Sequence, residues 1–156
     1  MKLLFKQRFF SWFDSYDIFD EAGQTVYTIQ GKLDWGHCLH ILNAAGEHIG
    51  TVQEKILTFL PKFELFVGEQ KIGEIRQEWT LFRPRFTLDC GGWTVVGDWM
   101  EWNYVVQNAS GNKIAGVEKQ IWNWTDTYVL DIVRPEDALR VLMVALAIDA
   151  EKCGKN

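Results

Sequence analysis

The sequence predicts a mainly β protein, or α+β in schemes that count its helix, in which about twelve antiparallel strands form a closed β-barrel. Two features support this prediction. A turn motif recurs between alternating apolar residues, and residues 138–148 near the C-terminus are apolar almost without interruption. An open sheet of many short strands has two unpaired edges, which closure removes. The apolar segment then fills the barrel as a central hydrophobic helix.

The recurring turn consists of Asp or Asn, two further residues and Gly. A side-chain oxygen at the first position accepts a hydrogen bond from the backbone two residues on, and Gly at the fourth takes the left-handed conformation of a type I turn with a bulge. Each copy predicts a hairpin, and a shorter turn at residues 67–70 predicts a fourth. The three full copies are Asp20–Gly23, Asn43–Gly46 and Asn108–Gly111.

Apolar residues alternate with polar ones on both sides of these turns, as at Leu39 and Ile41 before the second turn. A period of two is typical of β-strands. The same alternation along the rest of the chain predicts a single domain, residues 1–156, built from hairpins. We expect strands near residues 2–9, 13–19, 25–30, 37–42, 48–56, 62–67, 70–78, 84–89, 93–98, 102–107, 112–121 and 127–132.

A helix is predicted over residues 135–152. Pro135 suits the first helical position, Glu136 and Asp137 suit the positive end of the helix dipole, and Gly154 lies just past the end. These signals place the start and the end of the only predicted helix.

Most of this helix is apolar on all sides, with Arg140 as the one polar residue between positions 138 and 148. Such a helix belongs in a protein core. A membrane span needs about 20 apolar residues, more than this run supplies, so we expect no transmembrane segment. The predicted core contacts are Leu139, Leu142, Met143 and Leu146.

Charge and cysteine content exclude several classes of function. The net charge is -5, so the chain lacks the basic excess of a nucleic-acid-binding protein. Three widely spaced cysteines fit neither a disulfide framework nor a zinc motif. Charged residues interrupt the apolar N-terminus before it reaches signal-peptide length. We therefore expect reduced thiols and a cytoplasmic location. The cysteines are Cys38, Cys90 and Cys153.

Five segments, in this order, resemble the LURP-one-related proteins of the tubby C-terminal-like superfamily, which includes the phospholipid scramblases. The resemblance spans nearly the whole chain. It implies a twelve-stranded antiparallel barrel threaded by a hydrophobic C-terminal helix. The segments are the two turns Asp20–Gly23 and Asn43–Gly46, Lys55–Leu65, Trp93–Asp98 and Asp137–Asp149.

The resemblance implies less about function. Tubby domains bind phosphoinositide head groups and scramblases have a calcium-linked membrane role, whereas compact members like this chain mostly lack an assigned biochemical activity. This sequence departs from those relatives, because it has no EF-hand-like spacing and no Cys-rich palmitoylation segment.

One hairpin brings histidines together. His40 and His48 flank the second turn, and Cys38 shares a strand face with His40. A tetrahedral metal site needs four converging ligands, and this hairpin supplies two or three. We expect surface histidines here, as at His37, and no metal.

Catalytic motifs are absent from the sequence. No serine lies in a GxSxG elbow, and no Walker or GxGxxG loop occurs. Asp98 and Glu101 fall on opposite strand faces, while Glu74 and Glu78 share one. We expect no catalytic residue, no cofactor and no enzymatic activity, with a hydrolase that uses a carboxylate pair as the alternative.

Two binding hypotheses follow. In the first, basic residues at strand ends form a patch for a phospholipid or phosphoinositide head group, or else a solvated barrel rim among interspersed carboxylates. These residues are Lys32, Lys55, Lys62, Arg76, Arg83 and Arg85.

In the second hypothesis, surface tryptophans form a platform for a glycan or a protein partner, unless they point inward onto the helix. The tryptophans are Trp99, Trp102, Trp122 and Trp124. Both hypotheses describe a binding or scaffold domain, and neither identifies its partner.

Overall fold

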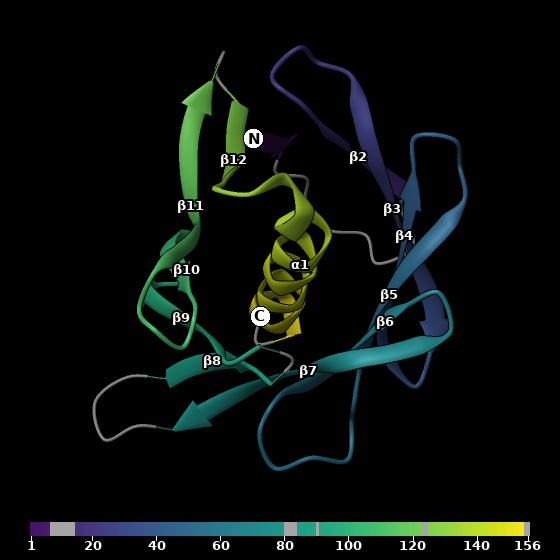
Figure 1. The fold of residues 1–156 in the computed structure, drawn as a ribbon. Helices are drawn as coiled ribbons and strands as arrows, with labels where there is room; N and C mark the ends of the chain where they lie inside the picture. Colours follow the sequence, from purple (N-terminus) through teal and green to yellow (C-terminus); the bar gives the residue numbers. More distant parts are fainter. Residues whose placement is uncertain (7–14, 80–83, 90, 123–124, 155–156) are drawn as a thin grey trace.

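A computed structural model describes residues 1–6, 15–79, 84–89, 91–122 and 125–154. The described residues form twelve strands around one central helix (Figure 1). The strands are β1 (Lys2–Lys6), β2 (Ser15–Phe19), β3 (Thr25–Asp34), β4 (Gly36–Asn43), β5 (His48–Glu54), β6 (Lys62–Val67), β7 (Gln70–Trp79), β8 (Pro84–Leu88), β9 (Trp93–Asp98), β10 (Asn103–Gln107), β11 (Lys113–Trp122) and β12 (Thr125–Ile132).

The strands form a closed antiparallel barrel. Each strand pairs with its neighbours in the chain, and β1 pairs with β12 to close the sheet. The predicted fold class is confirmed, and every expected strand occurs. The main difference lies between residues 30 and 37, where β3 and β4 continue until they meet at a tip formed by Trp35. Lys32 pairs there with Cys38, and Asp34 pairs with Gly36.

The predicted hairpin turns also occur. In the second turn, the Asn43 Oδ1 atom accepts hydrogen bonds from the N–H groups of Ala45 at 3.0 Å and Glu47 at 2.9 Å. Gly46 has a φ of 82°, which favours glycine, and the register shifts by a bulge just before the turn. The first and last copies, Asp20–Gly23 and Asn108–Gly111, have the same side-chain and backbone bonds.

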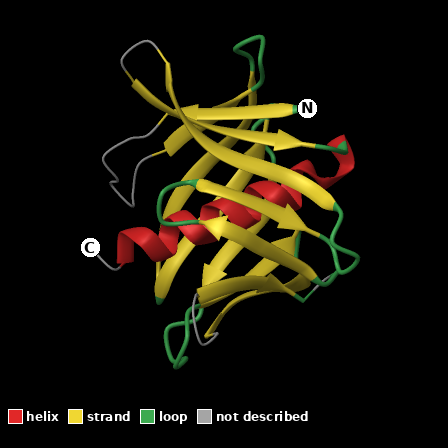
Figure 2. Cartoon of the chain, turned by 90° about the vertical axis from the view of Figure 1, so that its left-hand side faces the viewer, coloured by secondary structure: helices red, strands yellow, loops and turns green. Residues whose placement is uncertain are grey.

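The predicted helix occurs as a 3-10 turn, η1 (Pro135–Asp137), followed by α1 (Ala138–Gly154), and it ends at Gly154 rather than before it. It runs through the barrel along its length (Figure 2). Residues 141–148 are all buried among the inward side chains of the strands. Of the four predicted core contacts, Leu142, Met143 and Leu146 are fully buried, while Leu139 is half-buried and packs against the same core.

Arg140 is accommodated at the edge of this core. Its guanidinium lies 4.9 Å from the centroid of the Trp93 ring and 3.5 Å from the Asp137 carboxylate. The described part of the chain contains no helix that combines the length and the apolar character needed to cross a bilayer.

Candidate functional site

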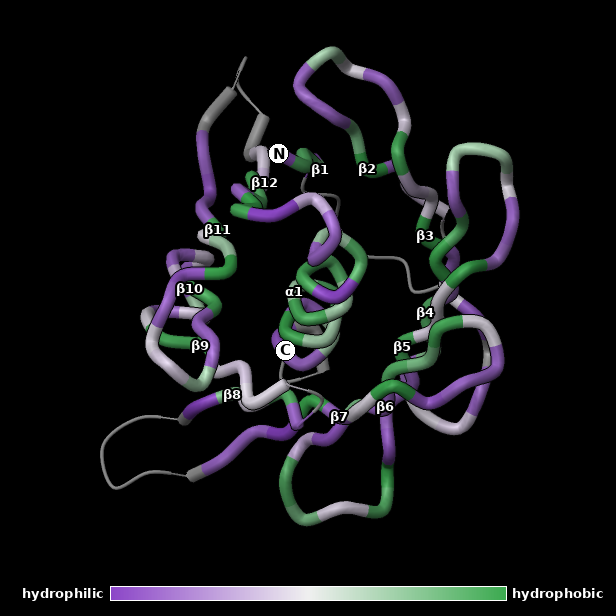
Figure 3. Tube along the Cα trace, viewed as in Figure 1, coloured by the Kyte–Doolittle hydropathy of each residue, from purple (hydrophilic) through white to green (hydrophobic). Residues whose placement is uncertain are grey.

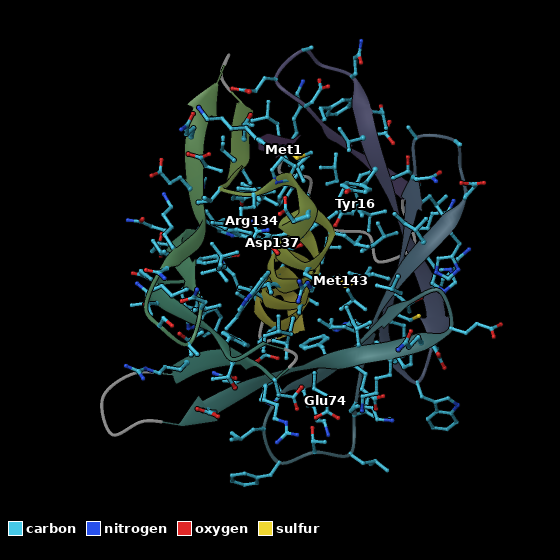
Figure 4. All side chains as sticks on the ribbon, viewed as in Figure 1. Met1, Tyr16, Glu74, Arg134, Asp137 and Met143 are labelled. Carbon is cyan, nitrogen blue, oxygen red and sulfur yellow. The ribbon has the colours of Figure 1, made fainter. Side chains whose placement is uncertain are left out.

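The outer face of β5, β6 and β7 carries the densest group of charges among the described residues. Side chains alternate along β6, so Phe63 and Leu65 point into the core while Lys62 and Glu64 point outward. On β7, Glu74 lies opposite Glu64. Figure 4 shows Glu74 on the side of β7 that faces away from α1.

Four cations surround these two carboxylates. Glu74 contacts Lys71 at 2.6 Å, Lys62 at 2.9 Å and the Nη2 atom of Arg76 at 2.6 Å. We call Lys55, Lys62, Lys71 and Arg76 the cation cluster. Glu64 joins it through Lys55 at 2.8 Å and Lys71 at 3.3 Å.

The contacts keep both carboxylates ionised. Hydrogen bonds from Lys71, then from Lys62 and Arg76, lower the pKa of Glu74 to about 2, although burial opposes this shift. The hydrogen bond from Lys55 likewise lowers the pKa of Glu64, with Lys71 adding to the effect. A carboxylate with a pKa of about 2 does not serve as a general acid at neutral pH.

The charges are arranged in two layers. The side chains of Glu64 and Glu74 are only 13% and 9% exposed, whereas those of Lys55 and Arg76 are 50% and 52% exposed. The carboxylates therefore lie beneath the cations, which meet the solvent first. Asp89 lies 3.3 Å from Arg76, and Glu78 also acts on Arg76 electrostatically, so the positive and negative charges of this region nearly balance on a chain of net charge -5.

The structure brings together three of the six basic residues predicted from the sequence, namely Lys55, Lys62 and Arg76. Lys32 lies on β3, two strands away from β5, and no described residue forms an ion pair with it. Arg85 is exposed on β8 opposite Glu78. Arg83 lies outside the described residues. The sequence analysis did not identify Lys71. This lysine directly follows the predicted turn at residues 67–70, and the hairpin places its ammonium group 3.3 Å from Glu64.

A second feature adjoins the cluster and was also missed. We call Trp35, Leu57 and Phe59 the apolar rim, because these large side chains project from two adjacent loops. Trp35 occupies the tip between β3 and β4, and the other two lie in the loop between β5 and β6. In Figure 3 much of that loop is green although it projects from the barrel.

The two loops touch and border an open surface hollow of about 440 Å³. Its lining includes Trp35, Leu57 and Lys55, so it borders both the apolar rim and the cation cluster. The contact between the loops is close: a Cβ atom on Gly36 would lie 2.5 Å from the Cγ2 atom of Ile56.

The two histidines that flank the second turn lie against each other. The rings of His40 and His48 stack with centroids 4.0 Å apart, and the Nε2 atom of His48 lies 2.9 Å from both the Gly50 carbonyl oxygen and the Thr51 hydroxyl. Burial lowers the pKa of His40, and His48 and Lys32 lower it further. No three His, Cys, Asp or Glu side chains converge as metal ligands in the part of the chain that the structure describes.

Glu74 and Glu78 share the outer face of β7, as expected, but Arg76 lies between them. Glu78 accepts a hydrogen bond from the hydroxyl of Thr87 at 3.2 Å. Asp98 instead accepts one from the backbone N–H of Glu101, which stabilises the turn after β9. Neither pair is arranged as two facing carboxylates.

Two of the four tryptophans in the platform hypothesis point inward, which confirms the alternative orientation for them and makes the platform hypothesis wrong at these two positions. Trp99 and Trp102 are buried, because the barrel needs bulky side chains around its helix. Trp99 packs edge-on against Phe86, and Trp102 packs against Tyr128 at 4.1 Å. Trp124 and the side chain of Trp122 lie outside the described part of the structure.

Comparison with known proteins gives two matches. The model of the family described as LURP-one-related matches residues 1–149. The chain is also similar to "Uncharacterized protein YxjI" of Bacillus subtilis (strain 168), with 26% identity over 151 residues that cover 96% of this chain and 92% of that protein. The matched region contains the cation cluster, the apolar rim and most of the helix.

Proposed function

The chain belongs to the LURP-one-related family, and from this premise we propose that it is a non-enzymatic binding domain whose ligand is the head group of an anionic phospholipid. The cation cluster is the proposed site. A cytoplasmic location, expected from the sequence, puts this site opposite the membrane leaflet that is rich in anionic lipids.

The observation that supports this proposal most directly is the layered arrangement of charges. Glu64, which is mostly covered, and Glu74, which is buried, hold the cluster cations in fixed positions, with part of each cation exposed. A lysine ammonium has three N–H donors and an arginine guanidinium has five, so donors remain after the carboxylates are satisfied. A phosphate group binds to such donors without first ordering long side chains, which reduces the entropic cost of binding.

The charge balance predicts how this binding behaves. The charges of the cluster and its neighbouring carboxylates nearly balance, and the whole chain is negative, so long-range attraction to an anionic surface is weak. Short-range hydrogen bonds from ammonium and guanidinium groups to phosphate oxygens supply the affinity instead. Binding is therefore expected to need an accessible phosphate and to weaken as salt is added.

Vesicle sedimentation tests the proposal. We expect the protein to sediment with phosphatidylcholine vesicles that contain a phosphoinositide, and to stay in solution with phosphatidylcholine alone, both at low salt. Lys71→Gln and Arg76→Gln should each weaken sedimentation by about fivefold. Lys2→Gln, which removes an exposed lysine from β1, is the matched control and should change nothing. Equal sedimentation with and without the phosphoinositide at low salt would contradict the proposal.

A further inference from the structure

We infer that the apolar rim docks this protein onto a lipid bilayer, with Trp35, Leu57 and Phe59 entering the interfacial layer while the cation cluster contacts the phosphates. This inference rests on the proposed head-group binding. It adds a second contact with the membrane, and the strength of this contact depends on burial of the apolar rim in the bilayer.

The first support is the degree of exposure. Trp35, Leu57 and Phe59 are 83%, 95% and 99% exposed, whereas the next most exposed large hydrophobic residue in the described part of the chain, Val133, is 59% exposed. Single exposed apolar residues are ordinary on a protein surface, but three nearly complete exposures on adjoining loops mark an interaction site.

The second support is that the loop has a defined shape. The hydroxyl of Thr58, which has one proton to donate, lies within hydrogen-bond distance of the carbonyl oxygens of Lys55 at 3.0 Å and Leu60 at 2.7 Å. The base of the loop is closed by a backbone hydrogen bond from Lys55 to Lys62 at 2.9 Å. Leu57 and Phe59 therefore project outward from a loop that is held by these internal hydrogen bonds.

The third support is the position of the rim relative to the charges. Lys55 and Lys62 bracket the loop that carries Leu57 and Phe59, and both lysines belong to the cation cluster. Cations at the base of an apolar protrusion match the layers of a membrane surface, where phosphates lie outside the acyl chains. Tryptophan, found here at Trp35, favours the boundary between these layers.

The same geometry favours a bilayer over a protein surface. The rim consists of three side chains that protrude from the ends of two touching loops, whereas a flat protein interface would bury a continuous patch with a packed centre. A fluid interface surrounds each tip individually and needs no matching set of pockets. We therefore commit to a lipid surface, and self-association of the chain becomes an outcome that the experiment distinguishes.

The experiment uses vesicles of phosphatidylcholine and phosphoinositide, in which part of the phosphatidylcholine carries bromine on its acyl chains. Bromine quenches only tryptophans that reach the membrane. Although the chain has 8 tryptophans, comparing wild type with Trp35→Phe isolates the signal of Trp35. We expect bromolipid to quench wild-type emission, and the Trp35→Phe variant to lose most of this quenching while it still sediments.

A triple variant tests the energetic contribution of the rim. Trp35→Ser, Leu57→Ser and Phe59→Ser together should weaken vesicle binding by at least about tenfold, because the lost burial is large. Binding of inositol hexakisphosphate, a soluble phosphate probe, should not change. A control with Val96→Ser and Val133→Ser removes exposed apolar residues elsewhere and should bind vesicles like wild type.

The outcomes separate this inference from the proposed function. If the triple variant binds vesicles like wild type, or bromolipid does not quench Trp35, the rim inference is wrong while head-group binding stands. If wild type binds neither vesicles nor inositol hexakisphosphate, the proposed function fails, and the inference fails with it. A wild-type dimer that the triple variant does not form, together with no vesicle binding, would identify the rim as a contact between copies and overturn the bilayer assignment.

Discussion

Glu64 on β6 and Glu74 on β7 lie directly opposite each other across an antiparallel pair of strands. Two carboxylates at this spacing repel, and the arrangement destabilises a sheet unless cations compensate for it. Lys71 contacts both carboxylates, at 3.3 Å and 2.6 Å, and thereby links them. The pair therefore organises the cation cluster, and we expect its removal to affect both stability and the proposed binding.

We predict that Glu74→Gln destabilises the protein by about 1 kcal/mol at neutral pH, because Lys62, Lys71 and Arg76 lose their common partner. Urea denaturation measures this change. Glu78→Gln is the matched control, since Glu78 lies on the same strand face without the three cations, and it should stay within about 0.5 kcal/mol of wild type.

The same variant should alter the dependence of stability on acid. Glu74 has a pKa of about 2 in the folded protein, below its ordinary value of 4.5, so the folded state favours the ionised form. The contribution of Glu74 to the free energy of unfolding is complete above pH 4.5 and is lost as the pH falls toward 2. Wild type should therefore lose more stability than Glu74→Gln over this range, and parallel curves for the two proteins would contradict the prediction.

Asp149 on α1 should have the opposite effect. Burial raises its pKa from 3.8 to about 7, against a smaller lowering by Lys152. The folded protein thus binds the proton more tightly than the unfolded chain. This contribution to stability is complete below pH 3.8 and is lost as the pH rises through 7.

The variant Asp149→Asn imitates the protonated side chain, so we predict that it is more stable than wild type at about pH 8 and that the difference shrinks toward about pH 5. Thermal unfolding at several pH values measures this dependence. An Asn variant that is less stable than wild type at about pH 8 would show that the carboxylate has a favourable partner in the folded state.

Gly36 should be needed for the contact between the two rim loops. Its φ is 92°, and a Cβ atom there would lie 2.5 Å from Ile56. We predict that Gly36→Ala destabilises the protein by roughly 1 to 3 kcal/mol more than Gly23→Ala. Both substitutions strain the backbone, but only the alanine at position 36 would also clash with a neighbouring residue. Gly23 has a φ of 78° and open space around it. Equal losses in urea denaturation would argue against a close loop contact.

The central helix should dominate the stability of the barrel. Leu142 is completely buried, so Leu142→Ala should cost about 2 to 5 kcal/mol. Leu139→Ala, on the same helix at a half-buried position, should cost clearly less. Guanidinium denaturation compares the two, and a larger loss at Leu139 would contradict the observed packing.

The barrel and its helix are predictable from sequence because their signals are local. The spacing from Asn43 to Gly46 specifies a turn through its own side-chain and backbone bonds. The apolar run around Leu142 suits only an enclosed helix. Neither signal depends on knowing which distant residues meet.

The candidate site depends on distant contacts, and this is why the sequence analysis identified it only in part. Alternation assigns Lys62 and Arg76 to an outer face, but the strand register decides that they meet around Glu74. Lys71 reaches the same cluster because the register shifts between Leu65 and Phe66. Lys32 is a lysine that points outward, as Lys62 and Lys71 are. It lies on β3, however, which is too far around the barrel to reach Glu74.

The apolar rim was unpredictable for a different reason. An apolar run such as residues 56–60 is normally expected in a core, and only the folded arrangement shows that Leu57 and Phe59 face outward. Trp35 falls between the expected strands at 25–30 and 37–42. It became a tip only because β3 and β4 continue beyond those bounds.

The most direct test of the account is a residue-by-residue map of ligand binding by NMR, with inositol hexakisphosphate titrated into isotope-labelled protein. The account predicts saturable shifts of backbone amides in β5, β6 and β7, centred on Lys62, Lys71 and Arg76, which weaken as salt is added. Unchanged spectra, or shifts confined to strands outside this group, would contradict the claim that the cation cluster is the binding site.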